Sequence, residues 1–133
     1  MKTRKIHDWD ISYSQARSLQ SELAPDIRHS RLKKNIKTVA GLDCAFSKDK
    51  SKVIAAVNVL SMGDFELLEQ SFAIEDTPIP YIPGLLSFRE APACIAAVEK
   101  LRITPDIFLV DGQGIAHPRR LGLASHLGLF FDK

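Results

Sequence analysis

The chain has 133 residues, of which 45% are hydrophobic and 26% charged, and its formal net charge is +2. This length suits one domain with a single core, and the composition excludes disordered and fibrous proteins. No apolar run is long enough for a membrane span, and the first ten residues lack the apolar stretch of a signal peptide. We therefore expect a single domain over residues 1–133 that is soluble, cytoplasmic and has no membrane partner.

The first predicted element is a helix from Ser12 to about Leu23, with Ser12 or Ser14 as its N-cap and Pro25 after its end. Basic residues then gather in two places. They are Arg28, Arg31, Lys33, Lys34 and Lys37 beside His29, and later Arg119 and Arg120. Such clusters contact phosphates in nucleic-acid-binding proteins, but they also occur as solvated surface. The sequence leaves both interpretations open.

Three strands are predicted next, at Thr38–Phe46, Lys52–Leu60 and Phe65–Ile74. Their short connections, including a turn at residues 62–64, favour an antiparallel meander. Residues 77–84 contain three prolines and a glycine, so they form a loop with few ladder hydrogen bonds.

The second half predicts a helix at Pro92–Arg102, a strand at Asp106–Val110 and a helix at Leu121–Phe131. The apolar run in the strand is continuous, which is typical of a central strand buried on both faces. The order of helix, three strands, helix, strand and helix indicates an α/β fold with a mixed sheet. The two cysteines, Cys44 and Cys94, have neither zinc-site spacing nor a disulfide framework, and we expect each to be a small buried residue.

Three acidic residues occupy costly positions. Asp43 lies inside an apolar strand, where a carboxylate needs a hydrogen bond, an ion pair or a metal. Asp111 follows the strand Asp106–Val110, at the kind of strand end where α/β proteins bind ligands. If the two strands are neighbours, both carboxylates can meet at one hard cation.

Glu90 is the third acid, and it has a simpler explanation. Ser87 and Glu90 have the spacing of a helix capping box, in which Glu90 would bond the backbone. Pro92 fits best at the first position of the helix, however, and this would place Glu90 just before it. Spacing alone therefore leaves open whether Glu90 is a cap or a metal ligand. A trio of such acids is one way to hold Mg²⁺ for phosphodiester hydrolysis.

Three segments resemble the motifs of the endonuclease V family, in the family's order and at its spacing. They are VAGLDCAF, PYIPGLLSFRE and PDIFLVDGQGIAHPRRLGLASHLGL, within residues 39–129. The resemblance implies an RNase H-like fold, a mixed sheet flanked by helices. It also implies a Mg²⁺-dependent endonuclease for DNA repair, with Mn²⁺ as a substitute metal. The enzyme would recognise inosine in DNA, or in RNA for some members. It would cut the second phosphodiester bond 3′ to the lesion, leaving a 3′-hydroxyl and a 5′-phosphate.

The resemblance also implies roles for individual residues. Asp43, Glu90 and Asp111 would bind the metal and be catalytic. Tyr81 would be a wedge that enters the duplex at the lesion, although the residues alone favour an aromatic that covers the core. Its neighbours Pro80, Ile82 and Pro83 would stiffen the wedge loop. The pocket for the flipped base would be formed by Gly84, Leu86, Gly112, His117 and Gly122. His126 is expected to be structural.

Two departures from the family bear on activity. Gln113 stands where many bacterial members have histidine. The chain also ends before a later strand with a catalytic lysine, so the sheet is expected to be incomplete at the C-terminus with an uncovered edge. The alternative function is therefore a catalytically impaired fragment that binds nucleic acid. Another RNase H-like nuclease, such as a junction resolvase, would share the acids but would not need PYIPG.

Overall fold

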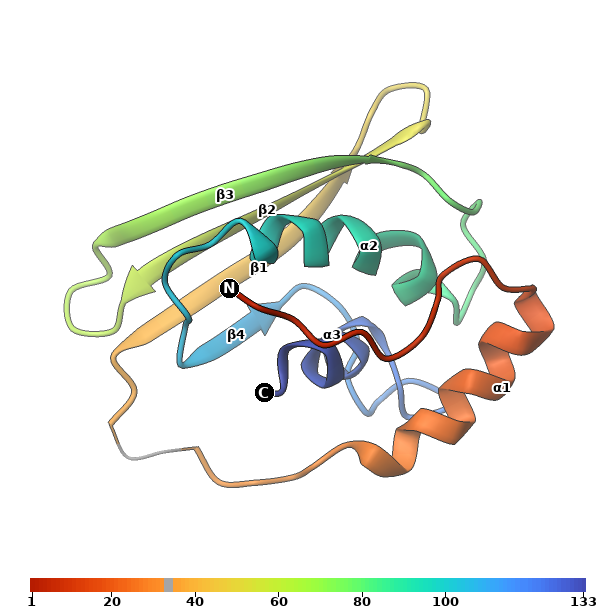
Figure 1. Cartoon of the computed structure of the whole chain (residues 1–133), viewed down its shortest axis with the longest axis horizontal. Helices are drawn as coiled ribbons and strands as arrows, with labels where there is room; N and C mark the ends of the chain where they lie inside the picture. Colours follow the sequence, from red (N-terminus) through yellow and green to blue (C-terminus); the bar gives the residue numbers. More distant parts are fainter. Residues whose placement is uncertain (33–34) are drawn as a thin grey trace.

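The computed structural model describes residues 1–32 and 35–133, and its centre is a four-stranded sheet (Figure 1). Strands β1 (Thr38–Phe46), β2 (Lys52–Ser61) and β3 (Leu67–Asp76) form an antiparallel meander. Strand β4 (Ile107–Val110) is parallel to β1, and the strand order is β3-β2-β1-β4. The predicted meander and the predicted mixed α/β sheet are therefore confirmed.

Two helices lie on one side of the sheet. Helix α2 (Leu86–Glu99) crosses β2 and β3, and α3 (Leu123–Phe131) packs against α2 and β4 (Figure 1). Helix α1 (Tyr13–Leu23) lies at the periphery and continues into the short 3-10 helix η1 (Ala24–Asp26). As predicted, Ser12 is the N-cap of α1, and its hydroxyl accepts a hydrogen bond from the Gln15 backbone N–H.

The core forms between α2 and the inner face of the sheet. Alternate residues of β2 are completely buried, as the two-residue period of a strand requires. These residues are Val53, Ala55, Val57 and Val59. The helix meets them with small side chains such as Ala93 and Ala97, which allow it to lie close to the sheet.

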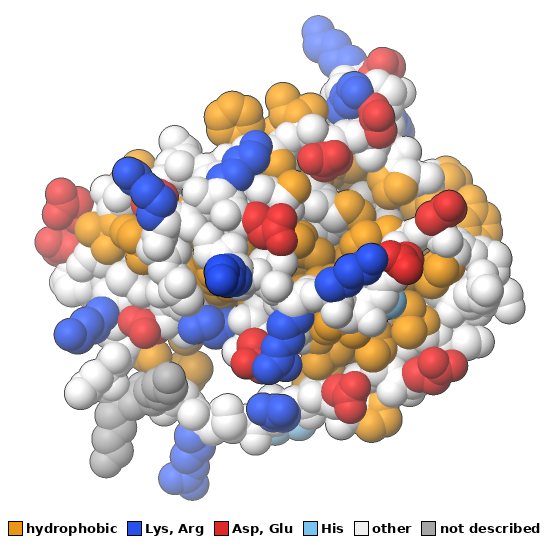
Figure 2. Space-filling view, viewed as in Figure 1, with side chains coloured by type: hydrophobic (Ala, Val, Ile, Leu, Met, Phe, Trp, Pro, Cys, Tyr) orange, Lys and Arg blue, Asp and Glu red, His pale blue; other side chains and the backbone are white. Residues whose placement is uncertain are grey.

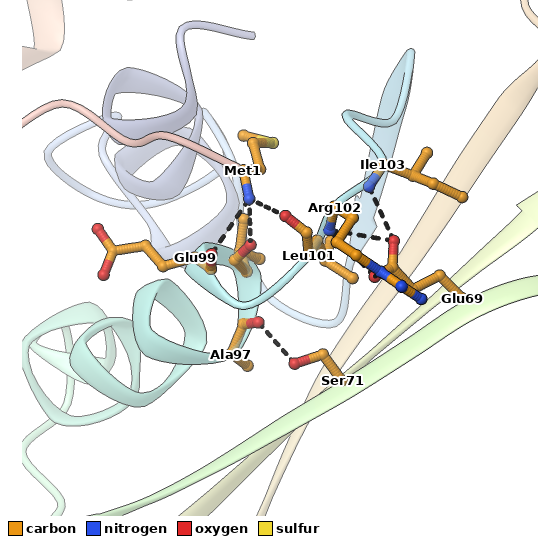
Figure 3. Close-up of polar contacts among 9 residues, drawn as sticks. Met1, Glu69, Ser71, Ala97, Glu99, Leu101, Arg102 and Ile103 are labelled. Carbon is orange, nitrogen blue, oxygen red and sulfur yellow. Dashed lines mark hydrogen bonds and ion pairs between the residues drawn. The ribbon is translucent and has the colours of Figure 1, made fainter.

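The N-terminal segment crosses the two helices and fixes their ends (Figure 1). The Met1 amino group donates hydrogen bonds to the carbonyls of Glu99, at 3.1 Å, and Leu101, where α2 ends (Figure 3). A positive charge at this end complements the helix dipole. In the same region the Ser71 hydroxyl donates to the Ala97 carbonyl at 2.9 Å, which attaches β3 to α2.

Helix α2 begins at Leu86, six residues before the predicted start at Pro92. Both earlier placements of Glu90 are therefore wrong, because Ser87 is not an N-cap and Glu90 lies within the helix. The helix starts early because residues 86–91 bury Phe88 and Ala91. Pro92 is tolerated in the second turn, where its missing N–H deprives only the Phe88 carbonyl of a helical partner.

The prediction that β4 is buried on both faces is wrong. Leu109 is 63% exposed, because β4 is an edge strand of the described sheet and α3 covers only one of its faces. The other bounds differ slightly from prediction. Strand β2 ends at Ser61, β3 covers Leu67–Asp76, and α3 begins at Leu123. In the described part of the chain, no helix has the length and apolar character to cross a membrane.

Candidate functional site

Two of the three predicted acids lie beside each other at one end of the sheet. Asp43 is in β1 and Asp111 directly follows β4, and the parallel pairing matches Leu42 with Val110. The Asp111 backbone N–H donates to the Leu42 carbonyl at 3.2 Å, so the pairing continues to the acid itself. Both acids are exposed. The two strands that carry these acids are therefore neighbours, which is the condition under which their carboxylates can meet at one cation.

Glu90 lies on α2 and is only 8% exposed. Burial raises the pKa of Glu90 to about 7. The charge of Arg89 opposes this shift, and the charges of Asp43 and Asp111 add to it. The Arg89 guanidinium lies 4.2 Å from the centre of the Phe46 ring and forms no ion pair with Glu90. Within residues 1–32 and 35–133, no group hydrogen-bonds the Glu90 carboxylate. A buried, unpaired carboxylate near two other acids favours binding of a cation.

The three acids are near one another but do not form a closed metal cage. Among the described residues, no group of three or more His, Cys, Asp or Glu side chains has the geometry to hold a metal ion. Asp43 is exposed, whereas the adjacent Cys44 faces α2, where it meets Cys94. One Asp43 oxygen accepts a hydrogen bond from the Cys44 backbone N–H at 2.7 Å.

A cavity of about 320 Å³ lies next to these acids. Six of the predicted substrate-binding residues line it. They are Tyr81, Gly84, Leu86, Gly112, His117 and Gly122. Four more lining residues were not predicted for the pocket, and these are Gln20, Ser87, Gln113 and Leu123.

The remaining predicted substrate-binding residues, those of the wedge loop, lie between β3 and α2. Pro80 and Pro83 are exposed, and Ile82 packs against the small apolar cluster around Leu85. None of the three lines the cavity. Tyr81 is 65% exposed, so it does not cover the core as the residues alone suggested.

The carbonyl of Gly84 organises one wall of the cavity. It accepts hydrogen bonds from Gln20 Nε2 at 3.0 Å, His117 Nε2 at 3.0 Å and Arg119 Nη2 at 2.9 Å. Gly84 has a φ of 80°, which disfavours other residues, and a Cβ there would lie 2.7 Å from Arg119 Nη2. Both ends of the Gln20 amide form hydrogen bonds, because Nε2 also donates to the Leu121 carbonyl and Oε1 accepts from Arg119 Nε at 2.7 Å.

These contacts define the state of His117. Its Nδ1 accepts the Arg119 backbone N–H at 3.1 Å, so the ring proton is on Nε2 and is donated to Gly84. Burial lowers the pKa of His117 and keeps the ring neutral. Both ring nitrogens therefore bond the protein, and His117 positions the wall of the cavity.

Behind the cavity lies a histidine pair in which His126 is buried and His7 is half-buried. His126 Nδ1 is 3.0 Å from the Ser87 hydroxyl, and its Nε2 is 2.7 Å from His7 Nε2. Burial, together with the charge of His7, lowers the pKa of His126 to about 3. His126 is completely buried among aromatic rings, as its expected structural role requires.

The predicted basic cluster is only partly described, because Lys33 and Lys34 lie outside the described residues. Arg28 and Arg31 line a separate groove of about 970 Å³ along β4 and α3. Arg119 is bound to Gln20 and Gly84, whereas Arg120 is exposed. Among the described residues on the face shown in Figure 2, basic and acidic side chains are interspersed and form no continuous basic stripe.

Comparison with known proteins gives a consistent result. The sequence model of the Endonuclease V family matches residues 21–133. An Endonuclease V from Dehalococcoides mccartyi is 50% identical over 133 residues, which are 100% of this chain and 60% of that protein. The chain thus spans about 60% of the length of the curated relatives it matches.

Solved structures agree with this match. The crystal structure of Bacillus subtilis Endonuclease V superposes with a TM-score of 0.92 at 32% identity, covering 100% of this chain and 58% of that one. Endonuclease V from Ciona intestinalis has been solved with a 24mer DNA that contains an inosine followed by a ribo-adenosine. It superposes with a TM-score of 0.80 at 30% identity, covering 87% of this chain and 52% of that one.

Proposed function

Because this chain belongs to the Endonuclease V family, we propose that it carries the site of an endonuclease that acts on inosine-containing DNA. One observation carries the proposal, which is that the cavity adjoins the acids. Gly112 lines the cavity and is bonded to Asp111, and the lining residue Leu86 lies one helical turn before Glu90. A base held in the cavity would therefore have its phosphodiester backbone beside the acidic residues.

In this proposal Asp43, Glu90 and Asp111 hold Mg²⁺, for which Mn²⁺ can substitute. The donors are all carboxylate oxygens, which suit hard cations. Glu90 supports the assignment, because its pKa is raised to about 7 and a nearby divalent charge would favour the ionised form. When bound, the metal would neutralise charge that develops on the phosphate and lower the pKa of the attacking water.

Recognition would combine the wedge loop with the cavity. The exposed ring of Tyr81 can stack in place of a displaced base, and the prolines around it limit the flexibility of the loop. The cavity volume of about 320 Å³ is at the lower end for ligand pockets, which suits a single flipped base. Gly84, Gly112 and Gly122 give the base edge access to backbone groups, while His117 holds Gly84 in place.

Cleavage would occur at the second phosphodiester bond 3′ to the lesion and leave a 3′-hydroxyl and a 5′-phosphate. The enzyme would serve repair of deaminated DNA in the cytoplasm. RNA that contains inosine presents the same base edge and is a second potential substrate.

A second candidate function is binding without cleavage. It is supported by the separation of the three acids, which form no metal-holding cluster in the described residues.

End-labelled duplexes with inosine or guanine at one position distinguish the two functions. With Mg²⁺, the nuclease proposal predicts a nick on the inosine strand that EDTA and Asp111→Asn abolish. Asp64→Asn, an exposed acid in the turn between β2 and β3, is the matched control and should leave nicking intact. Tighter binding to inosine without a nick supports the second candidate. Equal affinity for both duplexes without a nick contradicts both.

A further inference from the structure

The only two cysteines of the chain meet across the core. Cys44 lies on the inner face of β1 and Cys94 on α2, and their Sγ atoms are 3.3 Å apart although 50 positions separate them in the chain. Both are free thiols in this structure. The spacing of the two cysteines along the chain does not predict this contact.

We propose that Cys44 and Cys94 are a site of reversible oxidation that closes an intramolecular disulfide between β1 and α2. The geometry supports it, because the two sulfurs need to approach by only about 1.3 Å to reach bonding distance. With no other cysteine in the chain, an intramolecular partner for either thiol can only be the other one.

Differences in burial set the order of the chemistry. Cys44 is partly exposed, whereas Cys94 is 1% exposed. The hydrogen bond to Cys44 and burial raise the pKa of the Cys94 thiol, so Cys94 remains protonated while Cys44 is unmodified. A small oxidant therefore meets Cys44 first.

With a low-molecular-weight disulfide such as glutathione disulfide as oxidant, both steps balance. The Cys44 thiolate attacks one sulfur of the oxidant, which forms a mixed disulfide and releases one small thiolate. The Cys94 sulfur then attacks the Cys44 sulfur and displaces the second small thiolate, which takes up the Cys94 proton. Two electrons pass from the cysteine pair to the oxidant, and the released thiolates take up two protons.

The bond would join two elements that carry proposed metal ligands. Cys44 is adjacent to Asp43, and Cys94 lies one helical turn after Glu90. The cross-link would therefore fix the separation of β1 and α2 at the candidate site. Its formation does not depend on the proposed nuclease function; only its effect on the acids does.

Peptide mapping tests the inference on the full chain without any activity assay. The protein is incubated with glutathione disulfide or with dithiothreitol, the remaining thiols are alkylated, and the chain is digested with trypsin. We expect a disulfide-linked pair of the tryptic peptides 38–48 and 90–100 only in the oxidised sample. Cys94→Ser should instead retain glutathione on Cys44, and Cys44→Ser should yield neither product.

Thermal unfolding gives an independent measurement. Closing a 50-residue loop should raise the Tm of the parent by about 10 °C after oxidation, and should leave Cys94→Ser unchanged. Two results would overturn the inference. One is a parent chain that keeps both thiols free or stops at the mixed disulfide. The other is oxidised material in which the cysteines link two chains.

Discussion

Replacing Gln20 tests how α1 supports the candidate pocket. Gln20 is 1% exposed, and its amide forms three hydrogen bonds, to the carbonyls of Gly84 and Leu121 and from Arg119 Nε. Gln20→Met retains most of the side-chain volume and removes these bonds. Gln20→Ala removes both the bonds and the packing.

The expected magnitudes follow from these contacts. Leaving the half-buried Arg119 Nε without its acceptor, and two carbonyls with one donor fewer, should destabilise Gln20→Met by about 2 kcal/mol. Loss of packing should bring Gln20→Ala to about 3 kcal/mol, which corresponds to a fall in Tm of about 10 °C. Glu22→Ala, an exposed position on the same helix, should remain within about 0.5 kcal/mol of the parent.

Urea unfolding followed by Trp fluorescence measures these differences, because Trp9 packs on Phe88 of α2, the helix that contributes Leu86 and Ser87 to the cavity wall. Both Gln20 variants should also bind inosine-containing DNA more weakly, since the Gly84 carbonyl loses one of its three donors. A Gln20→Met variant as stable as the parent would refute the view that this amide holds the cavity wall.

Three further predictions concern other parts of the site. Gly122→Ala should destabilise the fold by about 3 kcal/mol, since its Cβ would lie 2.3 Å from the Gln113 carbonyl oxygen. The control Gly114→Ala should destabilise the fold much less, because the atom nearest to its Cβ would be 3.4 Å away. Equal unfolding free energies for the two variants would contradict this prediction. The contribution of His126 to the unfolding free energy should decrease as pH falls from about 6.5 toward 3, because the unfolded chain protonates His126 while the folded chain holds its pKa at about 3. In His126→Gln, unfolding in this pH range should take up about one proton fewer, which makes the dependence of the unfolding free energy on pH less steep. His29→Ala, at an exposed position, should leave that dependence unchanged. An unchanged dependence in His126→Gln would count against the buried neutral ring. Tyr81→Ala should weaken binding to inosine-containing duplex by about 1–3 kcal/mol without changing Tm. Tyr81→Phe keeps the ring and should bind as the parent does. A Tyr81→Ala variant with parental affinity would refute the wedge role of Tyr81.

Local patterns predicted much of the fold. The strand at Thr38–Phe46 has the predicted bounds, because alternation and its flanking residues define it. Helix α2 does not have its predicted bounds, because the prolines before it indicated a loop and Pro92 indicated the first position of the helix. The burial of Leu85 and Phe88 that extends the helix depends on contacts with distant segments, including Trp9 and Leu19. The apolar run of β4 likewise does not reveal that the strand lies at an edge of the described sheet.

The candidate site shows the same limit. The motif residues identified six of the lining positions, but Gln20 reaches Arg119 across 99 positions and His7 reaches His126 across 119. A weak signal for Gln20 exists, because it lies four residues after the buried Ala16 on the same helical face. The partners of a buried amide, however, come only from the tertiary fold.

The shared cation site is tested most directly by calorimetric titration of the metal-free chain with Mn²⁺ and Mg²⁺. The proposed ligands predict binding that Asp43→Asn, Glu90→Gln and Asp111→Asn each weaken at least tenfold, while Asp64→Asn binds as the parent does. Glu90→Gln should also be more stable than the parent in EDTA, because it removes a buried, unpaired carboxylate. Parental metal affinity in all three variants, or no binding by the parent, would contradict a common site for these acids.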